Sequence, residues 1–283
     1  MRLFAPHRYW FGTAPLWLMA ALLRSVAPAL ELLPTDFVSE TSYAAKLWSR
    51  QTLSSAAEES ENIVRRRDQT LSSRDGRSII QGDAHCLTTA GMVIFETLNL
   101  YGIDRCNRQN LADYGDEDRS GQYLFPPHLE EKQYGLWDPD PRVVTFDHED
   151  KFRGIKVYVF NSLADGIDET AGFESLPDVP RKNLALSFGK SRLWIEPLSG
   201  VVLDYENAGR SYFIETKAGE RVGELRARLS DRYTAETIKA QLHLATAMRE
   251  RICMLEFWLP LTCAAAGLIW LAAGFCTLRR GAR

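Results

Sequence analysis

One short segment, 116–121, gathers the oxygen-bearing side chains that a metal ion would need. It runs Asp-Glu-Asp-Arg-Ser-Gly, which matches the first half of a calcium-binding loop. The twelfth position of such a loop is a glutamate, but counting from Asp116 places Pro127 there. The 5 histidines are scattered and lack the H-E-x-x-H spacing of a zinc site. The sequence therefore predicts no metal site and no cofactor, and the segment is expected to form a solvated turn.

Motifs for phosphate binding and for nucleophilic catalysis are incomplete. Gly189-Lys190-Ser191 ends like a P-loop, but Leu184 stands where the first glycine of that loop belongs. The G-x-S-x-G motif of serine hydrolases does not occur. We therefore expect a protein that is not an enzyme.

The cysteines divide into two groups. Cys86 and Cys106 lie in a strand-rich region and are a candidate disulfide if that region faces an oxidising compartment. Cys253, Cys263 and Cys276 lie in or beside an apolar C-terminal run, where cysteine behaves as a small apolar residue.

That C-terminal run, 257–278, contains no charged residue and is long enough to cross a hydrocarbon core of about 30 Å as a helix. Arg279, Arg280 and Arg283 follow it, and such residues mark the cytoplasmic side of a span. The small residues and one tryptophan of the run are candidates for packing against a partner helix. They are Ala264, Gly267, Trp270 and Gly274.

The N-terminal segment, 1–34, is a second membrane element that allows two interpretations. It begins with basic residues and continues with an apolar run interrupted at Arg24. A retained signal anchor would keep the N-terminus in the cytoplasm. A cleaved signal peptide is the alternative, with a small-residue site at 27–29. Both interpretations place the middle of the chain outside the cytoplasm, so we expect a bacterial inner-membrane protein with a periplasmic or extracellular domain.

Between these ends, composition and pattern predict one domain with a β-rich body. The net charge of -3 and pI near 6.0 offer no general attraction to nucleic acid. Residues 35–77 are expected to be helical or irregular, and 78–228 to form an antiparallel sandwich or barrel-like sheet, because short strand-like runs alternate with turn residues. Residues 229–256 are expected to form an amphipathic stalk helix capped by Thr234, ahead of the span at 257–278 and a basic tail at 279–283.

An ordered set of phrases resembles the porin-PorA-like family of bacterial membrane proteins. The phrases are Pro34-Thr35-Asp36, Gly82-Asp83, 118–121, Phe125-Pro126, 130–134, Trp137-Asp138-Pro139, 152–158, 193–202 and Leu259-Pro260-Leu261. Cys86 and Cys106 are not part of this pattern. The resemblance implies two spans around a β-rich extracytoplasmic domain, and it implies no established activity.

Two functions from different classes remain as hypotheses. The preferred one is a non-catalytic accessory subunit that binds or braces a larger membrane complex, for example a respiratory, photosynthetic, transport or secretion assembly. The alternative is an extracytoplasmic protein that binds or transfers lipid or another envelope component, which requires a cavity of several hundred Å3. Porin-like transport ranks third, because two helices do not enclose a wide pore and an outer-membrane pore needs lipid-facing strands.

Overall fold

The computed structural model describes residues 16–22, 25, 32–50, 55–136, 142–170, 184–217 and 220–281. Contacts divide the chain into two compact units, and each is taken by itself below. One unit is the β-domain, Leu33–Ala245, and the other joins the terminal segments Met1–Leu32 and Thr246–Arg283.

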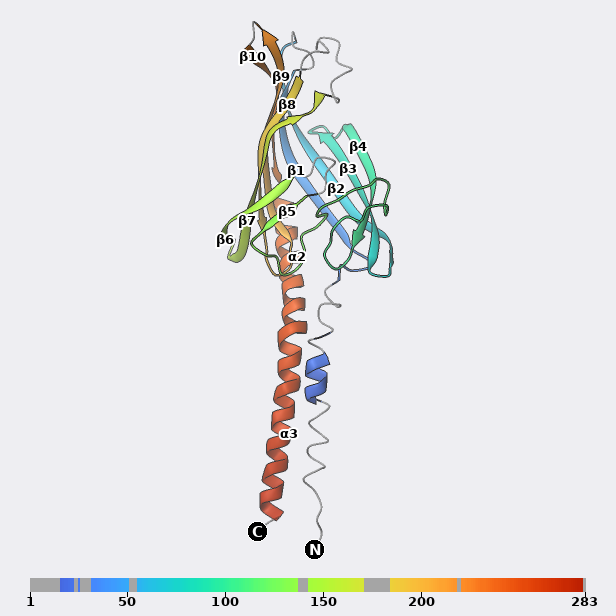
Figure 1. The fold of residues 1–283 in the computed structure, drawn as a ribbon, viewed down its shortest axis with the longest axis vertical. Helices are drawn as coiled ribbons and strands as arrows, with labels where there is room; N and C mark the ends of the chain where they lie inside the picture. The colour runs from blue at the N-terminus through green and yellow to red at the C-terminus, as the bar shows by residue number, and fades with distance from the viewer. Residues whose placement is uncertain are drawn as a thin grey trace. The chain divides into compact units, whose positions relative to one another are not determined.

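The described part of the β-domain folds into one 10-stranded sheet in which every pairing between strands is antiparallel (Figure 1). The spatial order is β4-β3-β2-β1-β10-β9-β8-β7-β6-β5, so the first and last strands of the domain are neighbours. The strands are β1 Val38–Ser49, β2 Glu58–Arg74, β3 Arg77–Thr88, β4 Val93–Asp104, β5 Gln133–Gly135, β6 Val143–Phe152, β7 Ile155–Asp168, β8 Leu184–Ile195, β9 Val202–Lys217 and β10 Glu220–Tyr233.

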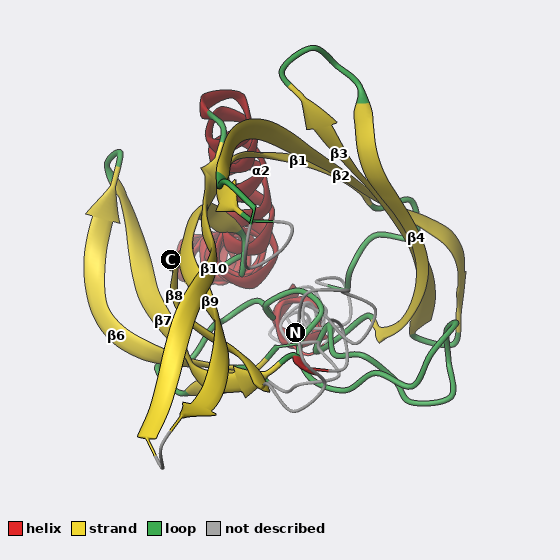
Figure 2. Ribbon diagram, turned by 90° about the horizontal axis from the view of Figure 1, so that it is seen from above, coloured by secondary structure: helices red, strands yellow, loops and turns green. Residues whose placement is uncertain are grey.

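The sheet corrects two expectations from the sequence. It is a single open, curved sheet with β4 and β5 at its edges, and not a sandwich of two sheets (Figure 2). Residues 35–77 are not a helical or irregular segment, because they contain β1 and β2. The charged run in β2 alternates across the sheet, with Arg65 and Arg67 exposed and Asp68 buried. Because ionic residues occupy inner-face positions of β2, the alternation of apolar and polar residues that predicts a strand is absent from its sequence.

The edges of the sheet are joined at one end by the segment that connects β4 to β5. Backbone bridges link Ile103 to Asn110, Gln109 to Gln122, and Gln122 to Leu136. We call this end the closed rim. The end that carries the β3–β4 and β9–β10 turns is the open rim. Among the described residues, hydrogen bonding therefore closes the sheet at the closed rim.

Residues 105–132, here called the plug, lie within the curve of the sheet (Figure 2). Phe125 and Leu129 of the plug belong to the main apolar cluster, which also contains the fully buried Phe160 of β7. Tyr123 of the plug packs in a second cluster with Tyr101 of β4. Each such large side chain contributes about 1.5–3 kcal/mol when it is fully buried. The apolar core thus sits on the concave side, where the plug covers the sheet.

A buried arginine and a tight turn hold the plug in place. The Nη1 of Arg108 donates hydrogen bonds to the carbonyl oxygens of Phe125, at 2.7 Å, and Ser199, at 2.9 Å. Gly200 follows with a φ of 73°, in the left-handed region that glycine adopts readily. A Cβ there would lie 2.4 Å from the carbonyl oxygens of Phe125 and Pro126. The β8–β9 turn is therefore tied directly to the plug.

Helices follow the sheet at the C-terminal end: α2 Ala235–Cys253, a π-helical segment η2 Met254–Trp258, and α3 Leu259–Gly281. Thr234 caps α2 as expected, since its Oγ1 accepts a hydrogen bond from the Thr237 backbone at 3.2 Å. The predicted stalk begins too early, because 229–233 belong to β10. Ile238, Ala245 and Ile252, which lie in the predicted amphipathic stalk, are buried.

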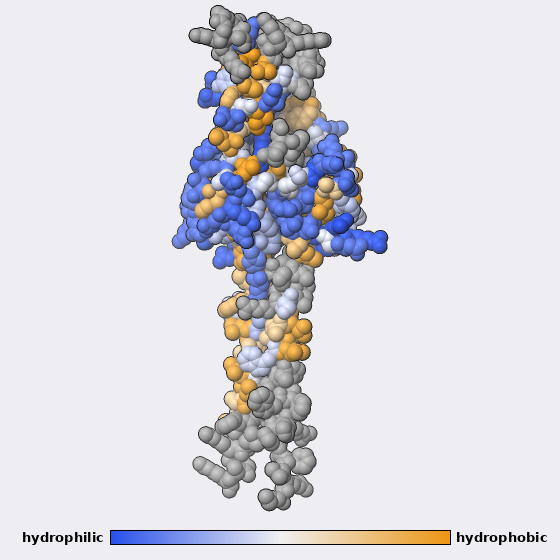
Figure 3. All heavy atoms as spheres, in the orientation of Figure 1, coloured by the Kyte–Doolittle hydropathy of each residue, from blue (hydrophilic) through white to orange (hydrophobic). Residues whose placement is uncertain are grey.

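One helical stretch, Ala235–Ala273, is long and apolar enough to cross a membrane, by length and composition alone. On the face drawn in Figure 3, hydrophilic residues predominate over the sheet and hydrophobic residues mark the described part of the C-terminal helix. Of the predicted N-terminal anchor, 16–22 are helical, and most of the remainder lies outside the described residues. The prediction of a second span therefore remains a prediction.

Candidate binding hollow on the concave face

A hollow of about 260 Å3 lies on the concave face of the sheet, lined by residues of β1 and of β7 to β10. Small side chains occupy most of its inward positions. They are Ser162, Ser187, Gly189, Ser191, Gly209 and Ser211. Gly189 and Gly209 face each other in the register of β8 and β9. Because side chains of this size leave the curve unfilled, the hollow is a property of the strands themselves.

Aliphatic side chains flank the hollow on both sides. Leu47 of β1 and Leu229 of β10 are paired across the two strands and both line it, together with Ile167 of β7. Ile167 follows a β-bulge at Gly166, whose φ is 70°. The hollow therefore offers aliphatic contacts at both sides and serine hydroxyls of β8 and β9 between them.

A second bulge brings an arginine to the hollow. The register of β10 against β9 shifts between Leu225 and Ala227, so Arg226 is the extra residue. Its guanidinium carbon lies 5.6 Å from the centre of the Phe213 ring. Burial lowers the pKa of Arg226 and the carboxylate of Glu169 opposes this effect. Arginine stays protonated in proteins, so the group remains a cation.

Toward the plug, the concave face carries three mutually packed tyrosines. The ring centres of Tyr43, Tyr205 and Tyr233 lie 5.0 to 6.0 Å apart. Above them, the Nδ2 of Asn207 donates to the Oδ1 of Asp231 at 2.8 Å. Burial raises the pKa of Asp231, and burial together with Asp231 raises the pKa of Tyr205. These groups form a polar layer between the apolar core and the hollow.

A buried ionic cluster occupies the same face nearer β2. The Nε of Arg66 lies 3.0 Å from the Oδ1 of Asp68. The hydroxyl of Tyr123 donates to Asp68 at 2.6 Å and accepts from Arg66 at 3.2 Å. Burial, and then the charge of Asp68, raise the pKa of Tyr123 well above its usual value. Since every member has a partner, the cluster explains how ionic side chains are accommodated inside the sheet.

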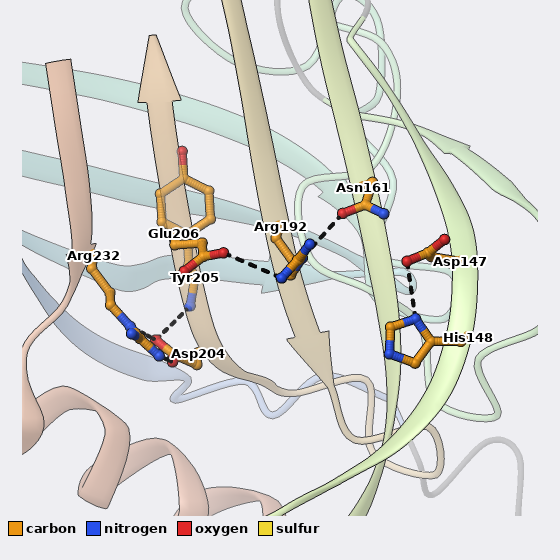
Figure 4. Close-up of polar contacts among 8 residues, drawn as sticks. All are labelled: Asp147, His148, Asn161, Arg192, Asp204, Tyr205, Glu206 and Arg232. Carbon is orange, nitrogen blue, oxygen red and sulfur yellow. Dashed lines mark hydrogen bonds and ion pairs between the residues drawn. The ribbon is translucent and has the colours of Figure 1, made fainter. Parts of the chain in front are cut away.

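A row of polar side chains crosses strands β10 to β6 (Figure 4). Arg232 pairs with the buried Asp204, its Nε 3.1 Å from Oδ2. The Nη1 of Arg192 lies 3.6 Å from Glu206, and its Nε donates to Asn161 at 3.3 Å. Arg192 directly follows Ser191, which lines the hollow, so the row faces the opposite side of the sheet. Cross-strand pairs of this kind contribute about 0.2–1 kcal/mol each, and the row supports strand pairing.

In that same row, His148 Nδ1 lies 2.9 Å from the Oδ2 of Asp147 on strand β6. Among the described residues, no three His, Cys, Asp or Glu side chains come together as a metal site.

Comparison with known families places residues 9–276 within the family described as Porin PorA. The chain belongs to this family. The match covers nearly all of the sequence and confirms the resemblance found in it. The family and the candidate apolar helix together indicate association with a membrane.

None of the curated proteins matches this PorA-family chain. A LolA superfamily protein from Nitrosomonas europaea is similar at 13% identity, over 76% of this chain and 91% of that one, with a TM-score of 0.14.

The structure places the predicted cysteine pair far apart, and the predicted disulfide is wrong. Cys86 is a buried free thiol of β3 opposite Phe95, whereas Cys106 is exposed just beyond the end of β4. Asp104 pairs with Arg77, at the other end of the β3–β4 hairpin. At about 3.3 Å per residue the separation is about 30 Å, and a disulfide needs Cα atoms within about 7 Å.

The predicted packing residues of the PorA-family chain all lie on α3, and the structure assigns an intramolecular contact to one of them. Gly267 is buried, and a Cβ added there would lie 3.1 Å from the indole nitrogen of Trp17. Trp270 is exposed, and Ala264 is half-buried. Gly274 lies farther along the same helix. Helix-to-partner packing therefore remains a prediction for these residues.

The acidic segment that resembles half a calcium loop forms a closed network of its own. Asp116 accepts a hydrogen bond from the Leu100 backbone at 2.6 Å and pairs with Arg119. The second guanidinium nitrogen of Arg119 pairs with Glu117 at 3.1 Å. This turn secures the plug to β4.

Proposed function

We propose that this chain is a non-catalytic, membrane-associated binding protein that holds an amphiphilic envelope molecule, such as a lipid, on the concave face of its sheet. The observation that carries the proposal is the hollow, which combines the aliphatic side chains of Leu47, Ile167 and Leu229 with serine hydroxyls and a cationic side chain. A surface of mixed character suits a ligand with an apolar part and a polar part.

The size of the hollow limits what it holds. Pockets for small molecules usually measure about 300–1,000 Å3, and the hollow is near 260 Å3. A whole lipid would not fit, so the hollow would take one portion of it and leave the remainder to extend past the open rim. The serines and arginine make this portion the polar end of the ligand.

Filling the hollow tests the proposal. Gly209→Val adds a side chain at a position where a new Cβ has no neighbour closer than 3.6 Å, so the strand should tolerate it. Ala208→Val is the matched control, because Ala208 is exposed on the other face of β9. The full chain, extracted in mild detergent, is analysed for co-purified lipid by mass spectrometry.

Wild type and the Ala208 variant should retain a bound amphiphile that the Gly209 variant loses. If none of the three carries one, or if all three carry it equally, the hollow is not the binding site.

Bracing of a larger membrane complex is the second candidate. It is favoured by the exposed apolar side chains of α3, including Leu261, Leu268 and Ile269, which would lie against lipid or a partner helix. Mild-detergent extraction should then return the chain in an assembly larger than 32.0 kDa. Recovery as a monomer, in conditions where other complexes survive, would argue against this role.

Both candidates assume that the sheet is outside the cytoplasm and both termini are inside. Protease added to intact spheroplasts should then remove the β-domain and spare the tails. Protection of the β-domain would reverse the proposed orientation.

A further inference from the structure

We propose that the hollow selects an anionic headgroup, phosphate or carboxylate, and that Arg226 is the side chain that pairs with it. This inference deepens the proposed function, on which it rests, by naming the chemical class of the ligand's polar end. The argument comes from the bulge in β10, a buried hydroxyl, and the balance of charge in the lining.

The bulge is what brings Arg226 to this face. Ala227 and Leu229 both line the hollow, so strict alternation would turn residue 226 to the opposite face. The extra residue in β10 breaks the alternation, and Arg226 joins the lining. Bulges commonly re-aim a side chain beside a binding site.

Ser211 supplies an independent sign of a missing ligand group. It pairs with Ala227 in the register of β9 and β10, directly beside the bulge. Its side chain lines the hollow and is only 8% exposed, yet its Oγ has no hydrogen-bond partner among the described residues. Buried hydroxyls are normally paired, and leaving one unpaired is costly. An oxygen of a bound anion could accept from both the Ser211 hydroxyl and the Arg226 guanidinium.

The charge of the lining favours an anion over a cation. Three arginines, Arg142, Arg210 and Arg226, line the hollow, and Glu169 is the only carboxylate among the described lining residues. Asp231 lies beneath, but Asn207 donates to it, and burial disfavours its ionised form. The planar guanidinium of arginine matches phosphate and carboxylate oxygens better than an ammonium does. A zwitterionic headgroup would also place a cation close to these arginines.

Binding is measured with the full chain in detergent, by native mass spectrometry with added phosphatidylglycerol or phosphatidylcholine. Wild type should bind phosphatidylglycerol about ten-fold more tightly, and Arg226→Gln should abolish that preference. Arg228→Gln is the control, because it removes the same charge from an exposed position two residues along β10. It should leave the preference unchanged. An Arg226→Gln chain that keeps the preference overturns the proposal.

Glu169→Gln provides a second variant in case Arg226→Gln does not fold. Removing the carboxylate of Glu169 should increase affinity for phosphatidylglycerol, whereas unchanged or weaker affinity would count against an anion site. Added inorganic phosphate distinguishes the source of the anion. If phosphate competes with phosphatidylglycerol, the headgroup alone suffices for binding. If phosphate does not compete and the preference over phosphatidylcholine is retained, the site requires a lipid-borne anion. Equal binding of both lipids by wild type overturns only this inference. Failure to bind either lipid or phosphate removes the proposed function as well.

Discussion

Removing one hydroxyl from the buried ionic cluster tests whether that cluster stabilises the sheet. In Tyr123→Phe, Asp68 loses a donor at 2.6 Å and Arg66 loses an acceptor at 3.2 Å. Hydrogen bonds to charged groups contribute about 1.5–3 kcal/mol each. The ion pair between Arg66 and Asp68 remains in the variant, so we expect the free energy of unfolding to fall by about 2–4 kcal/mol. That is a large part of the roughly 5–15 kcal/mol typical of a folded domain.

The assay is urea-induced unfolding of the full chain in detergent, followed by circular dichroism of the sheet. Tyr212→Phe is the control, because the Tyr212 hydroxyl makes no hydrogen bond within the described part of the chain, and it should change stability by less than about 0.5 kcal/mol. If the two variants unfold at the same urea concentration as wild type, the cluster does not stabilise the fold.

The difference in stability between wild type and Tyr123→Phe should depend on pH. Burial, followed by the charge of Asp68, raises the pKa of Tyr123 in the folded chain. In the unfolded chain a tyrosine loses its proton near pH 10. The contribution of Tyr123 is therefore complete below about pH 10 and declines above it. The difference in stability between wild type and Tyr123→Phe should be constant below about pH 10 and narrow as the pH rises above it. A difference that stays constant above pH 10 would refute the assignment of the shift to this site.

Three further outcomes follow from the geometry. Asp231→Asn should stabilise the chain at pH 7, because burial raises the pKa of Asp231 and disfavours its charged form. The gain in stability should vanish near pH 3, where the carboxyl group is protonated in both states, and urea unfolding at both pH values measures it. Gly200→Ala should cost more than about 2 kcal/mol in urea unfolding, since its φ is 73° and the new Cβ would lie 2.4 Å from the Phe125 carbonyl oxygen. Cys106 should react with maleimide in the folded chain and Cys86 only after denaturation, which mass spectrometry resolves by site.

The local sequence pattern predicted the C-terminal helices and the strands after Ser78. Most of the charge-free run 257–278 falls within the helical stretch Ala235–Ala273, which is long and apolar enough to span a membrane, and Thr234 caps α2 as its position indicated. The strands after Ser78 were recognisable from their residues and turns. β1 and β2 were not, because Arg66 and Asp68 occupy inner positions that apolar residues usually fill.

The hollow and the sheet order lie beyond local pattern for different reasons. Pairing of β1 with β10 joins segments at opposite ends of the domain, and no local signal encodes such a contact. The hollow did leave a signal, since Ser187, Gly189 and Ser191 alternate as small residues and Gly209 and Ser211 continue the pattern on the next strand. No sequence pattern identifies Arg226 as a lining residue, because its position on the concave face depends on a one-residue shift in the pairing of β10 with β9.

The adjacency of β1 and β10 also determines how the β-domain would respond to tension. The chain enters β1 and leaves β10 at the same end of that antiparallel pair, with Tyr43 opposite Tyr233. A pull on the two ends would peel their hydrogen bonds apart one after another instead of loading them together in shear. Thr237 would meet the load first, because its hydroxyl accepts from the Ser42 amide at 2.8 Å and donates to the Ser42 carbonyl at 3.1 Å. Loss of the Thr237 hydroxyl would therefore lower the force at which the β-domain begins to unfold.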